Sequence, residues 1–99
     1  MAQYDVYRLS GGRLVVDMQA SSLSALPTRM AAPLVPVDEG PMPLAHLEPV
    51  FVVGGVACAL HVGEMAAIPR SVLSGPSVAT LAGEAYRITK AVDFLFTGA

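Results

Sequence analysis

The side chains most able to carry out chemistry in this 99-residue sequence are two histidines, one cysteine and one arginine. His46 and His61 fall in a predicted loop and a predicted strand, and neither belongs to a metal-ligand motif such as His-Glu-x-x-His. Cys58 lies between Ala57 and Ala59 in an apolar run, where loss of solvent raises the pKa of a thiol and makes it inert. We therefore expect neither histidine to be catalytic, and Cys58 is best explained by core packing.

Arg29 is the remaining candidate for chemistry, since it lies in an otherwise apolar segment and could contact a phosphate or RNA. With Asp17 it is the only faint match to the arginine and acid–base residue of an endoribonuclease. An ion pair with a carboxylate is the alternative. The paired glycines lack the surrounding residues of a phosphate-binding loop. We therefore expect no catalytic residue, no metal site and no cofactor, and we predict that the protein is not an enzyme.

Composition narrows the possible partners. Six basic against eight acidic residues give a formal net charge of -2, too few positive charges to bind nucleic acid unaided. No apolar run approaches the roughly 18 residues that span a bilayer, and residues 1–5 do not resemble a signal peptide. A single cysteine excludes an intrachain disulfide and fits the reducing cytoplasm. With 54% hydrophobic residues, the excess apolar surface is expected to lie in a homo-oligomer interface.

The chain is expected to form one domain spanning residues 1–99, and the elements predicted up to residue 62 are strands. Alternating side chains in 4–9 and 14–19, around the turn Gly11-Gly12, predict a hairpin. Residues 29–37 predict an edge or bent strand, because prolines cannot donate ladder hydrogen bonds. Residues 49–53 and 56–62, around Gly54-Gly55, predict a second hairpin whose apolar character indicates that both faces are covered.

The rest of the chain changes from strand to helix. Residues 65–73 predict a turn and a short strand, and Ser74-Gly75-Pro76 is a break. From Ala82 onward apolar residues recur at helical spacing, and Gly98 is expected to end the helix. The fold class is therefore mainly β, an antiparallel, partly open barrel with one C-terminal helix.

The C-terminus is unusual because it is apolar, where chain ends are ordinarily polar and frayed. Phe94 and Leu95 fit the core stripe of the helix. Residues 96–99 are left to project from its last turn, a geometry suited to insertion into a partner's groove. This segment predicts a binding protein.

Several short motifs, in order along the chain, resemble the CcdB family of toxins from toxin–antitoxin systems. The matching motifs are Gln3-Tyr4-x-Val6-Tyr7, Val16-Asp17-Met18-Gln19, Arg29-Met30-x-x-Pro33-Leu34, Leu47-x-Pro49-Val50, Glu64-Met65-Ala66-x-Ile68-Pro69-x-Ser71-Val72-Leu73 and Ile88-x-x-Ala91-Val92-Asp93-Phe94-Leu95-Phe96-Thr97-Gly98. The resemblance implies an SH3-like barrel of the CcdB, MazF and Kid type, assembled as a homodimer.

The resemblance also implies a target and a site. Toxins of the family bind the gyrase A subunit and trap gyrase on cleaved DNA, performing no chemistry themselves. The implied gyrase-binding residues are Asp93, Phe96, Thr97, Gly98 and Ala99. The best-known member has Trp in place of Thr97 and Ile in place of Ala99, so this tail offers a smaller contact.

A CcdA-like antitoxin is the second implied partner, neutralising the toxin and repressing the operon with it in modules that maintain plasmids. We assign its contacts to Arg8, Arg13, Asp38, Glu39 and Pro41. Two alternatives remain open. The same barrel serves MazF and Kid endoribonucleases, for which Arg29 and Asp17 would be required. A non-toxic homologue would keep only antitoxin binding.

Overall fold

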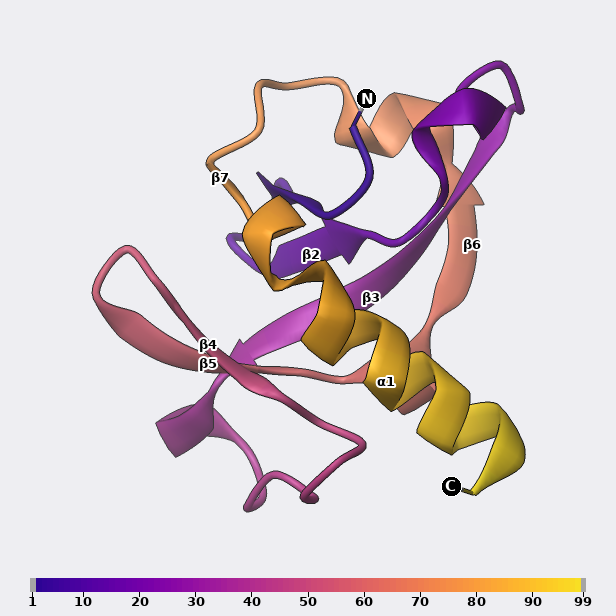
Figure 1. The fold of residues 1–99 in the computed structure, drawn as a ribbon. Helices are drawn as coiled ribbons and strands as arrows, with labels where there is room; N and C mark the ends of the chain where they lie inside the picture. The colour runs from indigo at the N-terminus through magenta and orange to yellow at the C-terminus, as the bar shows by residue number, and fades with distance from the viewer. Residues whose placement is uncertain (1, 99) are drawn as a thin grey trace.

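The computed structural model describes residues 2–98, which form short strands and one long helix (Figure 1). The strands are β1 (Asp5–Arg8), β2 (Leu14–Asp17), β3 (Thr28–Pro36), β4 (Val50–Val53), β5 (Val56–Leu60), β6 (Ala66–Pro69) and β7 (Ala79–Thr80). Single 3-10 turns connect them: η1 (Ser21–Leu23), η2 (Val37–Glu39), η3 (Val62–Glu64), η4 (Arg70–Leu73) and η5 (Ala82–Glu84). The helix α1 (Ala85–Thr97) follows them.

Strand β3 is the centre of the sheet. The strand order is β4-β5-β3-β2-β1-β7, every pair is antiparallel, and β6 also pairs with β3. On one side β3 pairs with β2, and on the other its first half pairs with β6 and its second half with β5. Residues 29–37 were predicted to form an edge or bent strand, and the edge alternative was therefore wrong.

The position of Pro33 explains why β3 can be central despite its prolines. The β6 ladder ends with the pair Ala31–Ala66, and the β5 ladder begins with the pair Leu34–Leu60. Pro33 lies in the gap between them, where its carbonyl accepts a hydrogen bond from the His61 N–H at 2.9 Å. Because no ladder donor is needed in this gap, the missing proline N–H leaves no partner unsatisfied.

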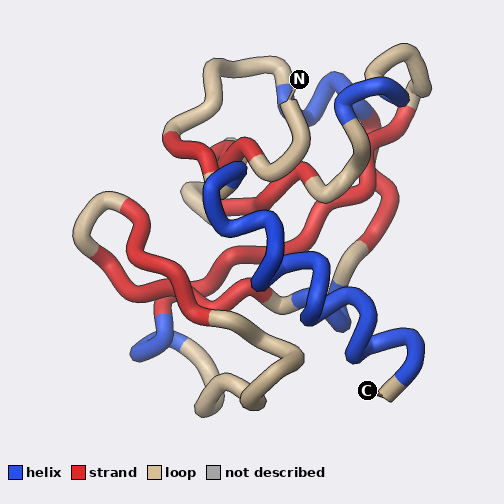
Figure 2. The backbone as a smooth tube through the Cα atoms, viewed as in Figure 1, coloured by secondary structure: helices blue, strands red, loops and turns tan. Residues whose placement is uncertain are grey.

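The sheet curls into a near-closed barrel with α1 lying across it (Figures 1 and 2). Val6, Val16, Leu34 and Leu60 form the main core, into which the helix inserts Ile88. A smaller cluster lies on the other face of the sheet. It contains Tyr7, Val15 and Ala31, which alternate with core residues along their strands, and Leu73 from η4. The predicted class of antiparallel β barrel with one C-terminal helix is confirmed.

The hairpin of β4 and β5 departs from expectation at its tip. Val52 is 71% exposed, and Val56 is exposed as well, although both were predicted to lie in a strand pair covered on both faces. Phe51 and Cys58 are buried at the other end of the hairpin. β4 ends the strand order, and in Figure 1 the tip extends away from α1, so no element within residues 2–98 covers it.

Candidate functional site

The C-terminal end of α1 is the part of the molecule to which the tail residues were assigned. Ile88 and Ala91 are buried and hold the helix on the barrel, while the end of the helix lies beyond the strands in Figure 1. Gly98 adopts the left-handed conformation, with a φ of 72°, and its N–H donates to the Phe94 carbonyl at 2.8 Å. Glycine permits this conformation without strain, so the predicted helix end is confirmed.

Three of the predicted residues share one exposed face of this helix end. Asp93, Phe96 and Thr97 are spaced i, i+3 and i+4, which places them side by side on a helix. Phe96 is 73% exposed, so its ring lies outside the core. The Thr97 hydroxyl donates to the Asp93 carbonyl at 2.7 Å. Ala99, the last predicted residue, lies outside the described residues.

Two further side chains extend this face toward the start of the helix. Tyr86 is 74% exposed, and the Lys90 ammonium lies 5.4 Å from its ring centroid. With Asp93 and Thr97 they follow the spacing i, i+4, i+7 and i+11, so all four lie along one stripe. The sequence analysis did not assign them to the site, although the same periodicity counted back from Asp93 would have found them.

The pair proposed for RNA cleavage is sealed inside the protein. The Arg29 Nη2 and Asp17 Oδ2 atoms are 2.7 Å apart, Nε donates to the same carboxylate, and both side chains are 0% exposed. Ala31 is the cross-strand partner of Asp17, and Arg29 lies two residues before Ala31 on the same strand. This spacing brings the two charged side chains together on one face of the sheet. An RNA phosphate cannot reach this pair, so the endoribonuclease hypothesis was wrong and the structural ion pair was the correct alternative.

Comparison with known families agrees with this picture of a barrel without an accessible catalytic pair. The family model described as CcdB protein matches residues 3–98. The chain belongs to the CcdB family. CcdB proteins are the gyrase-poisoning toxins of CcdA/CcdB toxin–antitoxin systems, and they poison gyrase without catalysing a reaction. A search among curated proteins gave no match.

The remaining candidates for chemistry in this CcdB-family chain include Cys58 and His61, and both have surroundings that suit a structural role. Cys58 is buried, and desolvation, followed by the charges of Glu39 and Asp38, raises the pKa of its thiol, as the sequence predicted. The His61 Nδ1 atom is 2.8 Å from a Glu64 carboxylate oxygen. Among residues 2–98, no three His, Cys, Asp or Glu side chains are grouped so that they could hold a metal ion. No helix in this part of the chain has the length and apolar character needed to cross a membrane.

The residues assigned to a CcdA-like antitoxin come from two loops and are all exposed. Arg8 and Arg13 flank the β1–β2 turn, where the Arg8 guanidinium donates to the Gly12 carbonyl at 3.0 Å. Asp38 and Glu39 form η2 after β3, and Pro41 follows. The start of β2 pairs with the second half of β3, so both loops emerge from the same end of neighbouring strands.

Proposed function

We propose that this CcdB-family protein binds the gyrase A subunit through the end of α1 and traps the gyrase–DNA cleavage complex. The observation that carries the proposal is the exposed ring of Phe96 at the end of a helix anchored in the barrel. Large aromatic side chains dominate binding energy when they enter a partner's pocket. In this proposal Asp93, Thr97, Gly98 and Ala99 belong to the same gyrase contact as Phe96. Since gyrase acts on DNA inside the cell, the proposal places this protein in the cytoplasm.

The proposal includes a homodimer that presents two such helix ends. Exposed apolar side chains on η1, β3 and η4 support it, namely Leu23, Met30 and Val72. Hydrogen bonds from Arg70 to Ser24 and Pro27 tie η4 to the loop after η1, so these apolar residues belong to one connected region. An apolar surface of this kind is typical of interfaces between subunits.

The test is gyrase-mediated cleavage of supercoiled DNA with and without the purified protein. We expect linear DNA to accumulate when the protein is added, and a gyrase variant that resists CcdB toxins to abolish the effect. Equal amounts of linear DNA in both reactions would contradict the proposal. That result, combined with retained antitoxin binding, would establish the non-toxic homologue instead.

We further propose that a CcdA-like antitoxin contacts the loops that carry Arg8, Arg13, Asp38, Glu39 and Pro41, and that the complex represses its own operon. Both loops are exposed at one end of the barrel, and they combine two guanidinium groups with two carboxylates. A disordered segment with both signs of charge could pair with each. This end is built from different elements than the helix end assigned to gyrase.

Replacing Arg8 and Arg13 together with glutamine should weaken antitoxin binding by about threefold to tenfold, since exposed ion pairs contribute little each. Titration calorimetry with the antitoxin encoded beside this gene would measure the change, and gyrase-mediated cleavage should stay the same. Arg70→Gln controls for the loss of positive charge elsewhere, because it removes one such charge from η4. Unchanged antitoxin affinity in the double variant would remove the two arginines from the contact.

A further inference from the structure

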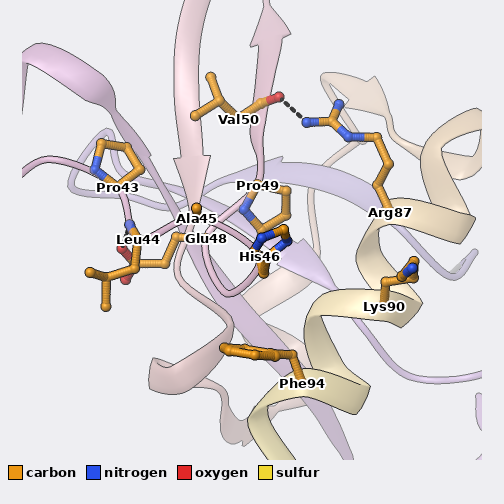
Figure 3. Close-up of a pocket in the computed structure, with 10 residues that line it drawn as sticks. All are labelled: Pro43, Leu44, Ala45, His46, Glu48, Pro49, Val50, Arg87, Lys90 and Phe94. Carbon is orange, nitrogen blue, oxygen red and sulfur yellow. Dashed lines mark hydrogen bonds between the residues drawn. The ribbon is translucent and has the colours of Figure 1, made fainter. Parts of the chain in front are cut away.

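A groove lies between α1 and the segment that leads into β4. Its volume is about 740 Å³. Leu44, His46 and Pro49 face Phe94 and Lys90 across it, as Figure 3 shows. Most of the lining is apolar, and Leu44 is 60% exposed, so the groove presents uncovered hydrocarbon to solvent. Phe96 does not line it, and among the lining residues only Lys90 also lies on the helix face assigned to gyrase.

The walls of the groove are held by specific interactions. The Glu48 carboxylate accepts the Leu44 N–H at 2.9 Å and lies 3.5 Å from the His61 Nδ1 atom, which fastens the loop to the barrel. Arg87 donates to the Val50 carbonyl at 2.9 Å (Figure 3). Its guanidinium also stacks over the Phe51 ring, 4.5 Å from the ring centroid. A groove with fixed walls does not have to order its own loops when a ligand binds, which favours affinity.

The charged groups at the groove are unevenly satisfied. The Glu48 carboxylate is turned toward Leu44 and His61. Arg87 forms an ion pair with Glu84, with 3.2 Å between the Nη1 and Oε2 atoms. Lys90 forms no ion pair within residues 2–98, and its ammonium lies over the Tyr86 ring instead. The groove therefore offers an apolar floor with positive charge along the helix side, in a chain whose formal net charge is -2.

We propose that this groove binds an acidic peptide segment of a protein partner. An apolar side chain of the peptide packs against Phe94 and Leu44, and a neighbouring carboxylate pairs with the Lys90 ammonium. A basic or uncharged peptide would leave Lys90 without a partner, and a purely polar ligand would leave the apolar floor uncovered. The inference goes beyond gyrase binding, because Leu44 and Phe94 lie outside the helix face assigned to gyrase, which shares only Lys90 with the groove, and because the test does not involve gyrase.

The test uses the full chain labelled with 15N and a synthetic peptide of alternating leucine and glutamate, with the matched leucine–lysine peptide as a control. We expect the acidic peptide to shift amide signals of residues 43–50 and 87–94 in a saturable way. Lys90→Gln should weaken binding about fivefold to tenfold, and added salt should weaken it further. Phe94→Ala should weaken binding independently of charge.

Arg70→Gln again provides the charge-matched control, because Arg70 lies in η4, outside the groove lining. Equal weakening by Arg70→Gln and Lys90→Gln would show a nonspecific charge effect and overturn the proposal. So would equal binding of the leucine–lysine peptide, or signal changes confined to the β4–β5 tip or the chain end. A variant that lacks residues 97–99 should bind the acidic peptide normally, which separates this inference from the proposed gyrase contact.

Discussion

Phe96→Ala is expected to reduce the potency of gyrase-mediated DNA cleavage by at least about thirtyfold. The Phe96 ring is 73% exposed on a helix whose other side is anchored in the core by Ile88 and Ala91, so it is available to a partner without rearrangement. Truncating an aromatic hot spot costs at least about 2 kcal/mol, and about 1.4 kcal/mol corresponds to a tenfold change in affinity. The measurement is the protein concentration that gives half-maximal linear DNA.

The control for this experiment is Val52→Ala, which also truncates a largely exposed apolar side chain but lies at the β4–β5 tip. It should leave DNA cleavage unchanged. A chain that lacks residues 97–99 should lose activity at least as strongly as Phe96→Ala, whereas Thr97→Trp should gain potency because an indole adds buried area. If Phe96→Ala keeps full potency, the helix end does not carry the gyrase contact.

The helix end could be predicted from sequence because its determinants are local. The spacing of Ile88 and Ala91 determines which side of the helix is buried, and Gly98 supplies the left-handed residue that ends it. The apolar character of the chain end can be read directly from the sequence. The exposure of Phe96 follows from the same periodicity. The hairpins joined by Gly11-Gly12 and Gly54-Gly55 could also be predicted from sequence, since a turn fixes the pairing of adjacent strands.

Features that depend on contacts between distant segments could not be predicted in the same way. The place of β3 at the centre of the sheet results from pairing with β5 and β6, which follow it by tens of residues, and the ladder gap that accommodates Pro33 exists only after both have paired. The groove also needs the loop before β4 to meet α1. Arg29 and Asp17 were visible as a possible pair, but their burial depends on how β2 and β3 align.

Breaking the buried ion pair is expected to have the largest effect on stability. Arg29→Met alone would leave the Asp17 carboxylate buried without its guanidinium partner. Asp17→Leu alone would leave the Arg29 guanidinium buried without its carboxylate partner. Removing one member of a buried pair costs about 3–5 kcal/mol, against a total free energy of unfolding of about 5–15 kcal/mol for a typical domain. The Arg29 Nη1 atom is already buried without a hydrogen-bond partner, so even the intact pair is not fully satisfied.

The double variant Asp17→Leu/Arg29→Met should therefore regain most of the stability lost in either single variant, because two apolar side chains remove both desolvated charges. Denaturant unfolding would measure each free energy, at one fixed protein concentration because dimer formation would add to apparent stability. Arg13→Met, at an exposed position beside the β1–β2 turn, is the control and should change stability by less than about 1 kcal/mol. If the single variants lose little and the double variant loses their sum, Asp17 and Arg29 act independently, and the pair does not hold β2 and β3 together.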